Sequence, residues 1–140
     1  MITKNYPVFA DTAYLRNTTI TNNSITDITD VDSQRDMRID DILIVNLDAT
    51  SRTVNIFINN GTTDFLLTTA TLSSSAGNSP TVGLLSIKGG ALTSFAFPSS
   101  GLGGGRFIFL PKGFKLRAKI DSTTNGYTVH VFGAKYPIVT

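Results

Sequence analysis

Side chains that could carry catalysis are scarce in this chain of 140 residues. Histidine occurs once, as His130, cysteine and tryptophan are absent, and every acidic residue is an aspartate. A hydrolytic triad needs a nucleophile, a base and a group that orients the base, and no feature around His130 in the run TVHVF identifies a nucleophile. We therefore expect His130 to be structural. The lack of cysteine excludes disulfides, thiolate metal sites and cysteine nucleophiles.

The aspartates suggest two further kinds of site, a carboxylate pair and a calcium loop. Asp40 and Asp41 are adjacent on a predicted strand, where neighbouring side chains point to opposite faces, so they should not share a reaction centre. Asp30 and Asp32 are spaced like the first ligands of a calcium loop, but Arg35 stands where that loop needs its glycine. A looser calcium site is the alternative, with Asp27, Asp30, Asp32 and Asp36 as its ligands. We expect these acids to be solvated instead, and we expect no cofactor.

A glycine-rich run, GLGGGR at residues 101–106, begins like a dinucleotide-binding fingerprint. Arg106 takes the place of its last glycine, and no helix is predicted to follow and direct its N-terminus at a phosphate. We interpret the run as a loop that serves as a hinge or a contact surface.

A basic strand is the clearest binding feature of the sequence. In residues 114–120 (FKLRAKI), Lys115, Arg117 and Lys119 alternate with apolar residues. An extended strand with this period buries one face and displays the cations on the other. Two more cations, Arg106 and Lys112, are close in sequence, and together these five residues are the predicted basic contact surface.

Nucleic acid is a possible class of ligand for such a surface, because a row of cations can follow a phosphate backbone. Platforms for single strands add exposed aromatic residues beside the cations, whereas Phe107, Phe109 and Phe114 fall at positions that the alternation assigns to the core. The net charge of +2 is also small for a dedicated nucleic-acid binder. We expect a protein partner and no nucleic acid.

The composition favours an all-β fold, since threonine, serine, asparagine and β-branched residues replace the strong helix formers. Residues 41–47 and 52–58 predict an antiparallel hairpin, and the NNG turn at 59–61 leads to a predicted strand at 65–72. Further strands are predicted at 82–88, 92–97 and 106–110, followed by a second hairpin formed by residues 114–120 and 127–136. Turn residues recur about every ten positions, which is typical of a sandwich or barrel.

We expect one folded unit. Residues 1–38 are predicted to be an irregular arm with one or two short strands that a neighbouring subunit could exchange, and residues 39–140 to be a β-sandwich domain. No stretch has the pattern of a signal peptide or the length of a membrane span, so we expect synthesis in a cytoplasm and no membrane partner.

Charge is divided unevenly along the chain. Residues 1–50 hold eight aspartates against four cations, and residues 101–140 hold six cations against Asp121. The acidic and basic ends could pair within the fold, between subunits, or with separate partners.

Two segments near the C-terminus carry a family resemblance. Residues 109–118 (FLPKGFKLRA) and 127–136 (YTVHVFGAKY) resemble the closing hairpin of small β-sandwich virion proteins of tailed bacteriophages, which include head decoration (cement) proteins and neck or tail components. The resemblance implies an antiparallel sandwich of jelly-roll type, a homotrimer, and a non-enzymatic structural role in the virion, most simply as a decoration protein that contacts the major capsid protein.

The expected contacts in that role are electrostatic. The basic surface would meet acidic groups of a neighbouring subunit or of the capsid, and the acidic arm, through Asp27, Asp30, Asp32 and Asp36, would meet basic ones. The alternatives are a neck or tail component and a carbohydrate- or receptor-binding sandwich. A sugar site would have to use Tyr6, Tyr14, Tyr127 or Tyr136 as its aromatic platform. An enzyme is the reading that the sequence favours least.

Overall fold

The computed structural model describes residues 12–87 and 107–138. The predicted strand at 92–97, the glycine-rich loop and Arg106 lie outside the described residues.

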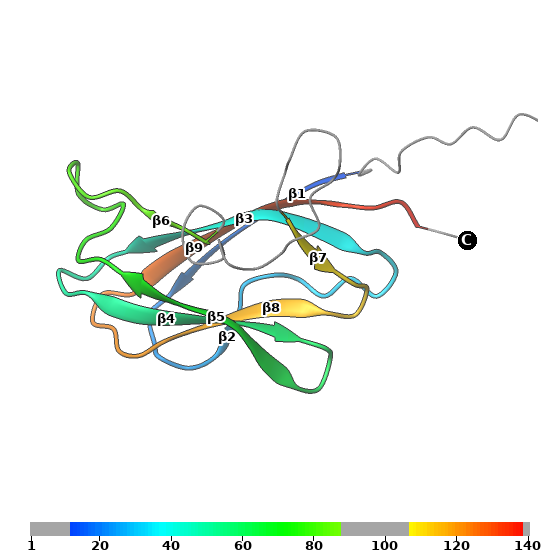
Figure 1. Cartoon of the computed structure of the whole chain (residues 1–140), viewed down its shortest axis with the longest axis horizontal. Helices are drawn as coiled ribbons and strands as arrows, with labels where there is room; N and C mark the ends of the chain where they lie inside the picture. The colour runs from blue at the N-terminus through cyan, green and yellow to red at the C-terminus, as the bar shows by residue number, and fades with distance from the viewer. Residues whose placement is uncertain (1–11, 88–106, 139–140) are drawn as a thin grey trace, which may run out of the picture.

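The described residues form two antiparallel sheets that pack face to face (Figure 1). Sheet A has the order β1 (Thr12–Ile20), β9 (Tyr127–Lys135), β3 (Met37–Asn46) and β6 (Leu85–Ser86), and β7 (Ile108–Leu110) also pairs with β3. Sheet B has the order β2 (Thr26–Asp27), β8 (Lys115–Ile120), β4 (Arg52–Asn59) and β5 (Asp64–Leu72). The predicted all-β sandwich is confirmed. Within the described ranges no helix is long and apolar enough to cross a membrane.

The hydrophobic core lies between the sheets and follows the alternation of the strands. In β8 the residues Leu116, Ala118 and Ile120 are fully buried, while the residues between them are not. Strands β3, β4 and β9 also bury alternate residues, with one break in the alternation of each strand. The packed face predicted for residues 114–120 is therefore confirmed.

The two predicted hairpins on either side of this core are wrong. Strands β3 and β4 lie in different sheets, and so do β8 and β9, so the turns at residues 47–51 and 121–126 cross from one sheet to the other. A hairpin and a crossing between sheets look the same in the sequence. A short polar turn joins the two strands in both arrangements, and each strand buries the same face whether the next strand lies beside it in one sheet or opposite it in the other. The turn predicted at 59–61 and the strand predicted after it are present, and β4 and β5 pair as a hairpin in which Gly61 adopts a positive φ of 105°.

The prediction of an irregular N-terminal arm is also wrong for the residues of β1. β1 is a regular strand of nine residues that pairs with β9 along its whole length, from Thr12 opposite Lys135 to Ile20 opposite Tyr127. Ile20 and Ile28 are part of the core. The alternation of β1 was hidden in the sequence because Leu15 faces outward and is 58% exposed, whereas Arg16 is only half-buried. The predicted strand at 82–88 is shorter than expected, with two residues in β6.

The strand pairs are nested in chain order. β4 pairs with β5, β3 with β6, β2 with β8, and β1 with β9. The chain therefore runs like one long hairpin, with β4 and β5 at its closed end, that is folded over into two sheets (Figure 1).

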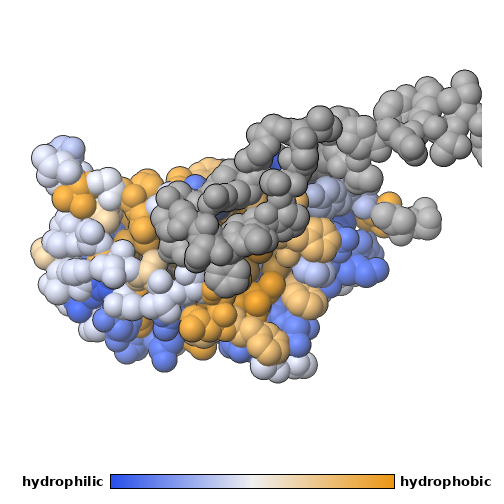
Figure 2. Space-filling view, viewed as in Figure 1, coloured by the Kyte–Doolittle hydropathy of each residue, from blue (hydrophilic) through white to orange (hydrophobic). Residues whose placement is uncertain are grey.

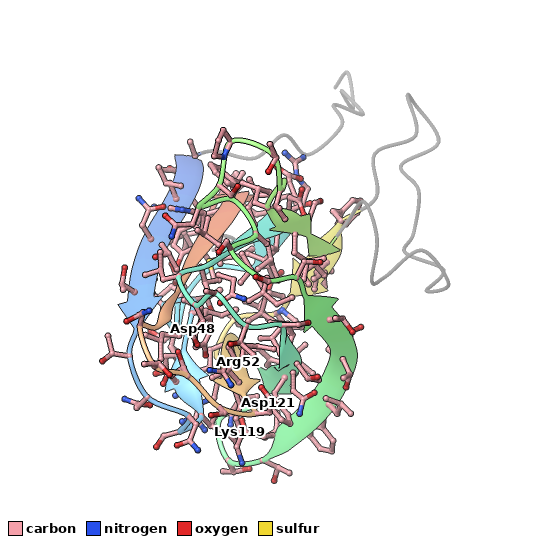
Figure 3. The ribbon with its side chains drawn as sticks, turned by 90° about the vertical axis from the view of Figure 1, so that its left-hand side faces the viewer. Asp48, Arg52, Lys119 and Asp121 are labelled. Carbon is pink, nitrogen blue, oxygen red and sulfur yellow. The ribbon has the colours of Figure 1, made fainter. Side chains whose placement is uncertain are left out.

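A buried aspartate ties the two sheet-to-sheet turns together. Asp48 is 2% exposed and accepts hydrogen bonds from the backbone nitrogens of Thr124 (3.0 Å) and Asn125 (2.6 Å), the Thr123 hydroxyl (3.2 Å) and Arg52 Nε (2.9 Å). Figure 3 shows Asp48 and Arg52 next to each other at this end of the sandwich. Burial opposes ionisation, but these donors outweigh it, so the pKa of Asp48 lies below its ordinary value.

Replacing this carboxylate should destabilise the fold. Asp48→Asn removes the charge that the buried donors require, and we expect it to lower the free energy of unfolding by about 3 kcal/mol. Because the folded-state pKa is lowered, the stability that Asp48 contributes is present above its ordinary pKa of 3.8 and disappears as the pH falls below it. Denaturant unfolding at pH 7 and at pH 3 measures both effects, and the two proteins should differ less at the lower pH.

Asp40→Asn is the matched control. Asp40 pairs with Arg38 at 2.8 Å, and its side chain is 40% exposed. Its replacement should cost less than about 1 kcal/mol. Equal losses in the two variants would contradict the role given to Asp48.

A second constraint lies where β9 crosses a bulge in β3. The register shifts between Ile39 and Asp41, and Gly133 stands opposite Ile39. A Cβ atom on Gly133 would overlap the carbonyl oxygen of Arg38. Only glycine lets the two backbones approach this closely.

Gly133→Ala should therefore force β3 and β9 apart. We expect the variant to lose more than about 2 kcal/mol of stability, measured by thermal or denaturant unfolding. Gly83→Ala is the control, because a Cβ atom there meets nothing within 4 Å. A Gly133→Ala protein as stable as the control would show that the bulge is more adaptable than its geometry indicates.

Candidate functional site

The predicted basic face of β8 is present on the outer side of sheet B, but two of its cations are held by the chain itself. Arg117 donates from Nε to Asp27 Oδ1 (2.8 Å) and from Nη1 to Asp64 Oδ2 (2.9 Å). Lys115 Nζ lies 3.1 Å from Asp27 Oδ2. Because Asp27 is on β2 and Asp64 on β5, Arg117 connects strands on both sides of β8 across the outer face of the sheet.

These contacts bear on the alternatives that the charge distribution left open. Asp27, from the acidic N-terminal part, pairs with Lys115 and Arg117, from the basic C-terminal part, inside one chain. Asp32 pairs in the same way with Lys135 at 3.0 Å. The two charged ends therefore pair within the fold at these positions, while Lys112 and Lys119 are exposed.

Removing Arg117 should separate its structural role from that of an ordinary surface cation. Arg117→Ala leaves Asp64 without its cation, and we expect the free energy of unfolding to fall by about 1–2 kcal/mol. The loss should be modest because Arg117, Asp27 and Asp64 are all partly exposed. Lys119→Ala on the same strand should change stability by less than about 0.5 kcal/mol. Denaturant unfolding measures both, and the difference between them should shrink at high salt. A Lys119→Ala protein as unstable as Arg117→Ala would contradict this assignment.

Asp30 and Asp36, two further acids of the predicted arm, also have partners within the chain. Asp30 accepts from Arg16 Nη1 at 2.7 Å, and its carboxylate and backbone nitrogen both contact the Tyr14 hydroxyl. Asp36 Oδ1 accepts from the backbone nitrogen of Lys112 at 2.9 Å, which attaches the segment before β3 to the corner before β8.

Asp32 serves as a local cap. Its Oδ1 accepts from the backbone nitrogens of Gln34 and Arg35, both at 2.9 Å. The hydrogen bond from Gln34 is the main reason that the pKa of Asp32 lies below its ordinary value, with burial opposing it and Lys135 assisting. This carboxylate is satisfied by donors that a calcium ion would have to displace.

The structure does not bring the candidate calcium ligands together. In the part of the chain that the structure describes, no group of three or more acidic or histidine side chains is placed to hold a metal ion. Asp40 and Asp41 also act separately, since Asp40 pairs with Arg38 and Asp41 accepts from the Ser86 hydroxyl at 2.7 Å.

His130 has a cross-strand partner on the outer face of sheet A. Its Nδ1 lies 2.7 Å from Asn17 Oδ1, and the two residues stand opposite each other on β9 and β1. This is an ordinary side-chain pair between antiparallel strands, and it fits the structural role expected for the histidine.

One aromatic residue is not where the sequence predicted it. Phe109 was expected in the core, but it is 45% exposed, because Ile108 and Leu110 on either side of it are the residues that point inward. Its ring lies 6.3 Å from that of Tyr136, centroid to centroid. Phe114 packs against the core as expected.

Several large apolar residues that the sequence pattern did not single out face outward. On sheet A, Leu15 stands opposite Phe132, and both are exposed. On sheet B, Phe65 and Leu66 are more than half exposed, 52% and 58%, near the β4–β5 turn. Figure 2 shows hydrophobic residues gathered at this end of β5. A signal was available for the second pair, since the run Phe65-Leu66-Leu67 cannot be buried whole in a strand of period two.

Comparisons with protein-family models, with curated proteins and with solved structures found no match for this chain.

Proposed function

We propose that this protein is a non-enzymatic structural component of a phage particle, a decoration protein of the head that binds to the capsid and to other copies of itself. The observation that carries the proposal is the nested strand pairing. Eight of the nine described strands form four nested antiparallel pairs, and an antiparallel chain folded over on itself in this way is the arrangement of a jelly roll, a fold that viral capsid domains use. The resemblance of residues 109–118 and 127–136 to phage virion proteins is a further support that rests on sequence alone, because the two segments lie in different sheets and do not form the hairpin that the resemblance implied.

The surface proposed for attachment differs from the purely electrostatic one that the sequence favoured. Lys115 and Arg117 already form ion pairs with Asp27 and Asp64, so these two cations are largely neutralised within the fold. The outer face of sheet A offers an alternative, since Leu15 and Phe132 form an adjacent apolar pair that water covers in the isolated chain. Burying such a pair against the capsid would contribute hydrophobic attraction.

Particle purification tests the proposal. The protein should copurify with assembled heads at a copy number comparable with that of the major capsid protein. A dozen or fewer copies per particle would point to the neck or tail, and absence from particles would refute a virion role.

The attachment face has its own test. The double variant Leu15→Ser with Phe132→Ser should lower retention on particles at least about tenfold, because it removes the apolar pair without touching the core. Val31→Ser is the control, since Val31 is 51% exposed but belongs to neither sheet. Equal retention of both variants would show that the outer face of sheet A does not take part in attachment.

The N-terminal segment can be tested separately. A deletion that extends to residue 35 would remove β1 and β2 and so disrupt both sheets. Deleting residues 1–11 leaves every described strand in place, and unchanged retention of that protein would exclude those residues from attachment.

A carbohydrate-binding role is the second candidate, favoured by one observation. Phe109 and Tyr136 form a tilted aromatic pair at the surface, and Arg38 is the cross-strand neighbour of Phe109. Exposed aromatic faces with polar neighbours suit sugar rings. Binding of the isolated protein to a glycan array, lost in Phe109→Ala, would favour this role over attachment to a capsid.

A further inference from the structure

We infer that Asn60, in the turn between β4 and β5, is a site of spontaneous deamidation, and that the fold protects the second Asn-Gly sequence of the chain, at Asn125. The modification needs no enzyme, and water is its only co-reactant. This inference concerns the chemistry of the isolated chain and does not depend on the proposed function.

Asparagine is among the chemically labile residues of proteins, and a glycine after it leaves the next backbone nitrogen unhindered. That nitrogen loses its proton to hydroxide and attacks the side-chain Cγ, so that a new C–N bond closes a five-membered imide. The side-chain amide leaves as ammonia and takes a proton from water. Water then adds to one imide carbonyl and breaks its C–N bond, which gives aspartate or isoaspartate. The net reaction consumes water and releases ammonia, without an oxidant or a reductant.

The chain contains the sequence Asn-Gly twice, at residues 60–61 and 125–126. Both copies lie in turns, and both glycines have a positive φ, 105° for Gly61 and 96° for Gly126. Local sequence and glycine conformation are therefore alike at the two sites, and only their surroundings distinguish them.

The first of these turns is open to solvent. It projects from the sandwich between β4 and β5 (Figure 1), and both Asn60 and Gly61 are exposed. A Cβ atom on Gly61 would have the Gly113 carbonyl oxygen as its nearest contact, at 3.8 Å. Water reaches this backbone nitrogen, and the turn has room to rearrange.

The hydrogen bonds that hold this turn are local. Asn60 Oδ1 accepts from the Thr62 backbone nitrogen (3.1 Å), the Thr62 hydroxyl (3.1 Å) and the Thr63 backbone nitrogen (2.9 Å). The Gly61 nitrogen donates to Asn59 Oδ1 at 2.7 Å. These bonds must open before Cγ can approach the glycine nitrogen. Because Thr62 and Thr63 are exposed, water can replace Asn60 as their acceptor, and opening the turn does not disturb the core.

The second turn is tied to the core. Gly126 is buried, and a Cβ atom on it would lie 2.7 Å from the Ile20 carbonyl oxygen. Its nitrogen donates to the Thr123 hydroxyl at 2.8 Å, and the backbone nitrogen of Asn125 donates to the buried Asp48 at 2.6 Å. Opening this turn would remove donors from a buried carboxylate, so the reactive arrangement costs more free energy here than at Asn60.

Deamidation would change the charge and the backbone of the first turn. It lowers the net charge by one from its value of +2. An aspartate at position 60 keeps an acceptor for the Thr62 and Thr63 nitrogens, whereas an isoaspartate adds a methylene group to the backbone of the turn. Chains that age should therefore accumulate an acidic form that is altered between β4 and β5.

Peptide mapping by mass spectrometry, on the full chain, tests the inference. The protein is kept at mildly alkaline pH, below its melting temperature, and deamidation is followed at both sequences in the same samples. Asn60 should react at least about tenfold faster than Asn125, because its turn opens at a lower cost. In denaturant the two asparagines should react at similar rates, since the fold no longer distinguishes them.

Thr123→Val tests the cause of the protection. It removes the acceptor of the Gly126 nitrogen while nearly keeping the size of the side chain, so Asn125 should react faster and Asn60 should not. Thr124→Val is the matched control, because Thr124 contacts Asp48 through its backbone nitrogen, which the substitution leaves in place. It should change neither rate.

Three results would overturn the inference. These are equal rates at the two asparagines of the folded protein, a faster reaction at Asn125, and no reaction at Asn60 under conditions in which the denatured chain reacts. An unchanged rate at Asn125 in Thr123→Val would overturn the cause given for its protection.

Discussion

The arrangement of the sheets depends on a buried negative charge. Asp48 sits in the turn that carries the chain from β3 to β4, and its acceptor oxygens are occupied by the turn that carries it from β8 to β9. Without those donors the buried carboxylate would keep Arg52 as its one remaining partner, and its other acceptor positions would be left unsatisfied, which is costly. These hydrogen bonds therefore hold both crossing turns at one end of the sandwich, and they fix how sheets A and B face each other.

Electrostatics then divides the surface into structural and available parts. The ion pairs of Asp27 and Asp64 with Arg117 link β2, β8 and β5 across sheet B, so charges that could have served a partner stabilise the fold. What remains for recognition is largely uncharged. It includes the Leu15–Phe132 pair on sheet A and the exposed Phe65 and Leu66 on β5. Binding through such surfaces would rely on apolar contact, and it should be less sensitive to salt than binding through a basic stripe.

The sequence anticipated individual strands better than it did their neighbours. The alternation in residues 114–120 identified the buried face of β8 correctly, and the NNG run identified the turn between β4 and β5. The same reasoning failed at the turns after β3 and β8, and it took β1 for irregular chain. In each of these cases the deciding contact is with a strand far away in the sequence, such as β9 for β1, which no local pattern encodes.

The sequence alone determined the class of fold, the buried faces of β8 and its outward cations, because composition and period-two alternation are local properties of a chain. Only the tertiary structure decided which aspartates pair with those cations and which sheet each strand joins. It also decided that Phe109, Leu15 and Phe132 face outward. The reason is physical. Ion pairs, sheet partners and solvent exposure are set by distances between residues as far apart as Asp27 and Arg117, and those distances exist only after the chain has folded.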